Sequence, residues 1–193
     1  MKKRFLLITI LILSITLISA QQIGKIGSVY SIGAGSSLTG GVKGSASYEI
    51  TRASGAGLVY LYRINNTIDW ETGVSYSLYN IKTTPTEGIE REVSYSAMSL
   101  IDIPLGVRTT FDDYIFLNGG LLLGFGLNNT ATFDTQSGIG LYGGLGGVYD
   151  FRFGGSVFVN PYLKLHSLFP FTQWTYHARL LEYGVRLGFT YKF

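Results

Sequence analysis

Few side chains of this sequence could take part in acid–base or ion-binding chemistry, and several of these are spaced two or four residues apart. Asp69 and Glu71 form one such pair, and Glu182 and Arg186 form another. In a β-strand this spacing places both members of a pair on the same face. The polar set that we single out contains Arg63, Asp69, Glu71, Asp102, Arg108, Lys164, Glu182 and Arg186. Such a set could form an ion path or a catalytic constellation, or it could be a network of salt bridges that fills the interior of the fold. We favour the salt-bridge network.

The two histidines are the other candidates for chemistry. His166 belongs to an alternating segment, whereas His177 belongs to a long polar stretch. Ser167 directly follows His166, so in a regular strand the two side chains would point to opposite faces and could not act as a dyad. Because the chain has no Cys, disulfides and zinc–thiolate sites are excluded. We therefore expect no enzymatic activity, no cofactor and no metal site.

The composition excludes an ordinary soluble surface. Of the 193 residues, 46% are hydrophobic and only 14% are charged, whereas a typical soluble domain has roughly 25% charged residues. Aromatic residues make up 15% of the chain, which excludes intrinsic disorder.

The first 20 residues have the pattern of a secretory signal peptide. Lys2, Lys3 and Arg4 precede an apolar run over residues 5–18, and small residues lead to Ala20. The alternative is an anchor that stays attached, but the run is shorter than the ~20 residues of a spanning helix. We expect cleavage near Ala20 and a mature domain over residues 21–193. Cleavage leaves 12 basic and 12 acidic residues, so the mature chain is neutral and nucleic acid is not an expected partner.

The remaining chain alternates between apolar and polar positions with a period of two, which predicts β-strands. At the C-terminus the apolar positions are Leu181, Tyr183, Val185, Leu187, Phe189, Tyr191 and Phe193. Strands are predicted near residues 28–38, 54–63, 67–81, 94–110, 114–127, 138–151, 155–168 and 180–193. Residues 42–50 could instead be the true first strand or an extra one, so the count is eight or ten.

The connections alternate in length, with short turns near residues 64–66, 111–113 and 152–155 and longer polar stretches between the other strands. This pattern predicts an all-β fold, an eight-stranded antiparallel up-and-down transmembrane β-barrel with short periplasmic turns and longer extracellular loops. Pro104 and Pro161 lack the N–H that a closed barrel would use, so we expect a bulge or a missing ladder bond at both.

The apolar face of each strand is expected to point outward. If it pointed inward, the surface would consist of Gly, Ser and scattered charges, which is a poor coat for a soluble protein. With the apolar face outward, small residues and charges, including Lys192, would fill the narrow interior. Aromatic side chains would then form two girdles. The periplasmic girdle would contain Tyr62, Trp70, Phe111, Tyr149, Phe151, Tyr191 and Phe193, and the outer one Tyr76, Tyr95, Phe125, Phe169 and Trp174.

Three segments carry a resemblance to a known family: residues 103–108 (IPLGVR), 116–120 (FLNGG) and 181–193 (LEYGVRLGFTYKF). The mature chain resembles the small OmpA/OmpX-like barrels, and more closely the outer-membrane β-barrel domain family common in Bacteroidetes. Phe189, Tyr191 and Phe193 look like the terminal signal that the barrel-assembly machinery reads in such proteins. The resemblance implies contact with outer-membrane lipid and lipopolysaccharide, and it brings no catalytic motif.

Four functions are compatible with these observations. We expect a small monomeric outer-membrane barrel without enzymatic activity that has a structural or surface-interaction role through its outer loops. One alternative is a narrow porin-like passage for ions or small solutes. Another is an outer-membrane enzyme that modifies lipid A or phospholipid. The last is a secreted soluble barrel that binds a hydrophobic ligand, which Phe193 and the low charge content disfavour.

Overall fold

A computed structural model describes residues 24–38, 47–84, 94–127, 136–171 and 179–193. The predicted signal peptide, His177 and Trp174 lie outside these ranges. None of the described residues belongs to a helix long and apolar enough to cross a membrane.

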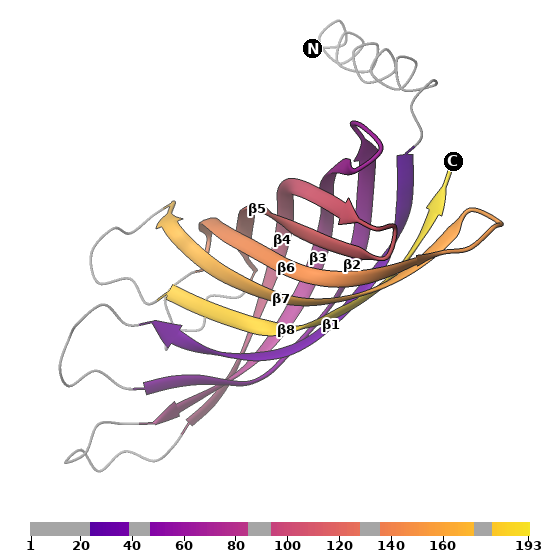
Figure 1. Ribbon diagram of the computed structural model, residues 1–193. Helices are drawn as coiled ribbons and strands as arrows, with labels where there is room; N and C mark the ends of the chain where they lie inside the picture. The colour runs from indigo at the N-terminus through magenta and orange to yellow at the C-terminus, as the bar shows by residue number, and fades with distance from the viewer. Residues whose placement is uncertain (1–23, 39–46, 85–93, 128–135, 172–178) are drawn as a thin grey trace, which may run out of the picture.

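Eight strands form a closed antiparallel barrel in which each strand pairs with its neighbours in sequence and the last strand pairs with the first. The fold class predicted from the sequence is thus confirmed. Figure 1 shows the first and last strands side by side along this closing seam. The strands are β1 (Gly24–Leu38), β2 (Ser47–Arg63), β3 (Ile68–Thr84), β4 (Ser94–Phe111), β5 (Ile115–Gly126), β6 (Gly138–Asp150), β7 (Gly155–Pro170) and β8 (Arg179–Lys192).

The strand count is eight, and residues 47–50 belong to β2, which also contains the strand predicted at residues 54–63. A register shift at Thr51 adds one residue to β2 relative to β3. Such a bulge reverses which positions face inward: Ile50 is buried before it, and Ala53, Leu61 and Val59 are buried after it. This change of phase explains why sequence periodicity suggested a possible separate strand over residues 42–50.

Each of the two prolines interrupts the pairing of its strand with only one of the two neighbouring strands. Pro104 keeps its register with β5, but the β3–β4 ladder lacks the pairs at Gly73 and Val74. Pro161 keeps its partner on β8, while the β6–β7 ladder skips the opposite positions. The expected loss of ladder bonds is therefore observed, without a register shift at either proline.

The barrel exterior is apolar. Outward positions of β5 and β7 carry no charged side chain: they are Ile115, Leu117, Gly119, Leu121, Leu123, Phe125, Val157, Val159, Pro161, Leu163, Leu165 and Phe169. Exposed aromatic side chains occur near both barrel ends, including Trp70, Phe111, Tyr149, Tyr191 and Phe193 at one end and Tyr95, Phe125 and Phe169 at the other.

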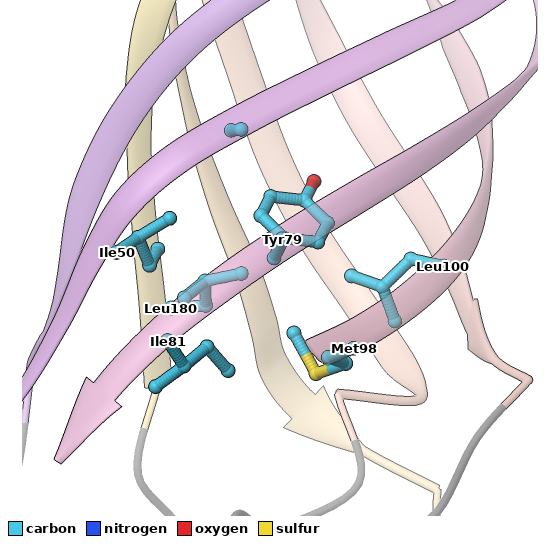
Figure 2. Packing of buried hydrophobic residues seen from close by; sticks show 7 residues of the cluster. Ile50, Tyr79, Ile81, Met98, Leu100 and Leu180 are labelled. Atoms are coloured by element: carbon cyan, nitrogen blue, oxygen red, sulfur yellow. The ribbon is translucent and has the colours of Figure 1, made fainter. Parts of the chain in front are cut away.

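The interior holds more hydrophobic residues than the alternation suggested. An apolar plug, made of Ile50, Ala53, Tyr79, Ile81, Met98, Leu100 and Leu180, fills the bore near the ends that the longer connections join. Figure 2 shows its side chains converging from β2, β3, β4 and β8. A second cluster, made of Val59, Leu61, Phe116 and Phe158, lies toward the end with the short turns. The expectation that only small residues and charges line the bore was therefore wrong, because side chains facing each other across eight strands must fill the space between them.

Candidate functional site: the polar interior

A buried carboxylate organises the half of the bore nearer the short turns. Glu71, from β3, is fully buried and accepts hydrogen bonds from Arg108 Nε at 2.8 Å and Arg186 Nη2 at 2.8 Å. The amide of Asn118 on β5 donates to the same carboxylate at 3.0 Å. Arg186 also donates to Asn160 Oδ1 at 2.9 Å. This basic cluster, formed by Glu71, Arg108, Arg186, Asn118 and Asn160, links β3, β4, β5, β7 and β8 across the bore.

The second hydrophobic cluster packs directly on this ion network. The guanidinium carbon of Arg108 lies 4.2 Å from the centre of the Phe116 ring and 4.6 Å from that of Phe158. Those two rings meet edge to face, with centroids 5.9 Å apart. A desolvated cation over aromatic faces is stabilised by the ring quadrupole. Arg108 is therefore fixed by both its carboxylate partner and the aromatic packing.

A second network, the acidic cluster, lies between the basic cluster and the apolar plug. It consists of Glu182, Asp102, Lys164, His166, Tyr162 and Tyr79. Glu182, from β8, accepts hydrogen bonds from the hydroxyl groups of Tyr162 and Tyr79, the latter at 2.7 Å. Lys164 Nζ lies 3.3 Å from Asp102 Oδ2 and 3.5 Å from Glu182 Oε2. The imidazole of His166 is placed between the same two carboxylates, with Nε2 3.1 Å from Glu182 and Nδ1 3.6 Å from Asp102.

Two ion pairs lie at the mouth of the barrel near the short turns. Arg63 Nε donates to Asp69 at 2.6 Å, and the Arg63 side chain is 41% exposed. Lys25 on β1 reaches Asp150 on β6 at 2.8 Å and Ser156 on β7 at 3.0 Å, so it bridges the opening. Sequence reasoning missed the ion pair between Lys25 and Asp150, because Lys25 precedes the predicted first strand. Lys192, which was expected inside, is exposed at this mouth.

The structure thus brings the predicted polar set together in three groups: Arg63 with Asp69, Glu71 with Arg108 and Arg186, and Asp102 with Lys164 and Glu182. Sequence reasoning did not single out the uncharged partners Tyr79, Asn118, Asn160 and Tyr162. All four occupy inward positions of the strand alternation, and this position was the signal that could have identified them.

Little open space is left between the two clusters. A void of about 30 Å³ is lined by the polar side chains of Lys164, Arg186, Tyr142, Tyr162 and Asn160 and by residues of β1, β2, β3 and β4. A space of this size accommodates water but not a solute. The apolar plug adjoins the acidic cluster, with the Tyr79 and His166 ring centroids 6.0 Å apart. Over the height of the two clusters and the apolar plug, the described part of the bore is therefore filled by side chains. A space of about 80 Å³ remains at the mouth near the short turns, between Lys25, Arg63 and Arg108.

The expectation that His166 and Ser167 point to opposite faces was wrong, because both side chains are buried. β7 carries a bulge here: the β6–β7 register shifts between Ile139 and Leu141, and Ser167 has a left-handed backbone with φ of 51°. The bulge breaks the alternation that the prediction assumed. His166 still contacts two carboxylates in a closed interior rather than an accessible nucleophile, so the arrangement resembles a structural network more than a catalytic one.

Two of the predicted assembly-signal residues, Phe189 and Tyr191, lie on β8, and Phe193 directly follows it. Phe189 and Tyr191 are outward and about half exposed, and Phe193 is 66% exposed. The Phe193 ring stacks on Tyr60 with centroids 6.3 Å apart, and its backbone N–H donates to the Gly24 carbonyl at 3.1 Å. The chain end is therefore tied to both β1 and β2.

Comparison with solved structures identifies small outer-membrane barrels. The outer membrane protein OprG from Pseudomonas aeruginosa is similar with a TM-score of 0.53 and 14% identity, over 89% of this chain and 96% of OprG. Two further structures align with TM-scores below one half. They are the attachment invasion locus protein Ail of Yersinia pestis (0.46, 15% identity, 88% of this chain and 99% of Ail) and the outer membrane protein AlkL (0.47, 15% identity, 89% of each chain). No protein-family model matches the sequence, and no curated protein matches it. The chain has the fold of a small outer-membrane barrel protein, and the fold alone is what this likeness shows.

Proposed function

We propose that the protein is a small monomeric outer-membrane barrel, of the type common in Bacteroidetes, which is exported and cleaved near Ala20. In this proposal it has no enzymatic activity and acts as a structural or surface-interaction protein through its outer loops. Its biogenesis would use the barrel-assembly machinery, which would read Phe189, Tyr191 and Phe193. Its outer surface would contact membrane lipid and lipopolysaccharide.

The distribution of polarity between the two faces of the wall supports a membrane location. Large apolar side chains such as Leu58, Leu145 and Leu163 are more than half exposed, whereas Glu71, Asp102 and Glu182 are completely or almost completely buried inside. A closed ring also pairs the backbone groups of each strand with its neighbours, as hydrocarbon requires. Exposing such a wall to water would favour aggregation.

The filled bore is the observation that carries the non-transport role. An ion crossing the barrel would have to separate Glu71 from both arginines and also pass the apolar plug around Leu100. We therefore expect no conductance steps from the purified protein in planar bilayers. Reproducible steps that disappear when Arg186 and Lys164 are neutralised would contradict the proposal and favour the narrow passage.

The membrane location is tested by fractionating cells and running the outer-membrane material on a detergent gel with and without boiling. A closed barrel migrates faster unheated, and mass measurement reports whether the chain begins after Ala20. Recovery in the soluble periplasm without a heat-dependent shift would contradict the proposal and favour a soluble ligand-binding barrel.

The lipid-modifying alternative is tested separately through the lipids of a deletion strain. An unchanged lipid A and phospholipid profile is the expected result. A change restored by the wild-type gene but not by a His166→Ala variant would establish an enzyme and contradict the proposal.

A further inference from the structure

A furrow of about 770 Å³ lies on the outer surface of the barrel, on the β6–β7–β8–β1 side. Its residues come from the strand ends near the short turns, and Tyr114 of the β4–β5 turn borders it. The furrow crosses the closing seam between β8 and β1. Its volume lies within the range of about 300–1,000 Å³ that small-molecule sites occupy.

The strand register explains why the wall is hollowed at this place. One row of outward positions crosses the four strands as Tyr30, Leu187, Val159 and Gly147. The adjacent row crosses them as Ser28, Phe189, Val157 and Tyr149. The short side chains Val159 and Val157 occupy the β7 positions of the two rows, with Gly147 at the β6 end of the first row and Ser28 at the β1 end of the second. Aromatic side chains occupy the other two ends, Tyr30 and Tyr149, and the β8 position of the second row, Phe189. The two valines and Gly147 form the floor, and the aromatic rings form the walls.

The chemistry of the furrow is that of a hydrocarbon site. None of its lining residues is charged. Polar side-chain atoms among them are confined to hydroxyl groups, those of Ser28 and of the tyrosines Tyr30, Tyr114 and Tyr149. Below it toward the turn, the rings of Tyr149 and Phe151 lie with centroids 5.0 Å apart, and those of Phe151 and Phe153 with centroids 5.2 Å apart. Aromatic residues of this kind favour the level of the lipid headgroups.

We propose that this furrow is a specific binding site for one acyl chain of a phospholipid in the periplasmic leaflet. The inference rests on the proposed location in the outer membrane. The level of the furrow matches that leaflet because it lies at the barrel end with short turns. A second copy of the barrel fits less well, because a two-fold interface would place furrow against furrow and leave both unfilled. A flexible hydrocarbon chain fills such a depression along its length.

Gly147 offers a direct way to block the site. A Cβ atom added there would have the Tyr114 carbonyl oxygen as its nearest neighbour, at 3.7 Å, so a larger side chain can project over the floor. Gly143, also outward on β6, is the matched control, because its Cβ would meet only the Asn118 carbonyl oxygen at 3.6 Å and it does not line the furrow. Gly147→Leu should fill the site, whereas Gly143→Leu should leave it open.

The probe is a phosphatidylethanolamine with a diazirine in the middle of one acyl chain, present in vesicles of phosphatidylethanolamine and phosphatidylglycerol. After irradiation, peptide mass spectrometry locates the crosslinks. We expect labelling of β7 around Val157 and Val159 to exceed that of the lipid-facing positions of β5 several-fold. Gly147→Leu should remove this excess, and Gly143→Leu should retain it. If Gly147→Leu does not fold, Val159→Phe, which narrows the floor, supplies the same comparison.

The heat-dependent gel shift is scored in the same vesicles, which separates the two proposals. Barrels that fold but are labelled evenly around the wall would overturn the lipid site alone, as would excess labelling that survives Gly147→Leu. Crosslinks that join two copies of the chain through the furrow would also overturn it and identify a dimer interface. A chain that never shows the gel shift in vesicles would contradict the proposed membrane location itself.

Discussion

Replacing Glu71 with glutamine tests whether the buried ion network holds the barrel together. Glu71 is fully buried and is the only carboxylate that either Arg108 or Arg186 contacts among the described residues. Glutamine preserves the size of the side chain but removes the one negative charge that the two guanidinium groups share.

The structure allows the expected loss to be bounded. Each hydrogen bond to a charged group is worth about 1.5–3 kcal/mol, and Glu71 accepts two from arginines, each at 2.8 Å. Removing one partner of a buried pair costs about 3–5 kcal/mol. We therefore expect Glu71→Gln to lower the free energy of unfolding by about 3–5 kcal/mol. With a urea m-value of about 2 kcal/mol/M, the midpoint would fall by roughly 1.5–2.5 M.

The assay is urea unfolding of the barrel in phospholipid vesicles, followed by tryptophan fluorescence and by the heat-dependent gel shift. Asp69→Asn is the control: the Asp69 side chain is 8% exposed, but the cation that it leaves behind, Arg63, is 41% exposed and stays hydrated. The loss should therefore be about 0–1 kcal/mol, as for an exposed pair. Equal midpoints for Glu71→Gln and Asp69→Asn would refute the reasoning, since the bore would then be wet enough to screen its charges.

Three further variants and one control variant test other parts of the barrel by the same measurements. Leu100→Ala should cost about 2–5 kcal/mol, because this side chain of the apolar plug is fully buried, and a loss below about 1 kcal/mol would show that the plug is loosely packed. Tyr79→Phe removes a hydrogen bond to Glu182 at 2.7 Å and should cost about 1–3 kcal/mol; an unchanged urea midpoint would argue against this bond. Gly27→Ala should give no fast-migrating unheated band, because the new Cβ would lie 1.9 Å from a carbonyl oxygen of β8. Gly143→Ala is the control and should fold normally, because its new Cβ would have no neighbour closer than 3.6 Å. Normal folding of Gly27→Ala as well would contradict the close approach of β1 and β8 at the seam.

The features that follow from period-two alternation were predictable from the sequence. In β8, for example, Leu187 and Phe189 face outward, and Glu182 and Arg186 face the bore. Inward charges in a narrow bore must find partners, because an unpaired buried charge is costly. The polar set could therefore be proposed from spacing alone, although which acid pairs with which base depends on the register between strands.

The parts that escaped prediction are those where the alternation breaks or where partners are distant in the chain. The bulge at Thr51 divided one strand into two apparent segments, and the bulge at Ser167 buried a residue that was expected outside. Neither position contains a glycine or proline that would mark it. The contact between Lys25 and Asp150 spans 125 residues, and no local pattern encodes such a separation.

The barrel can close between β1 and β8 only after β8 has been synthesised. β1 is synthesised first, yet one of its two neighbours is the last strand to be made, with Lys25 opposite Lys192. Until then β1 presents an unpaired edge, which is a template for pairing with other chains. Contacts of such large sequence separation also slow folding. The nascent protein must therefore be kept apart from its copies until β8 is made, and without β8 the sheet would retain two open edges, one on β1 and one on β7.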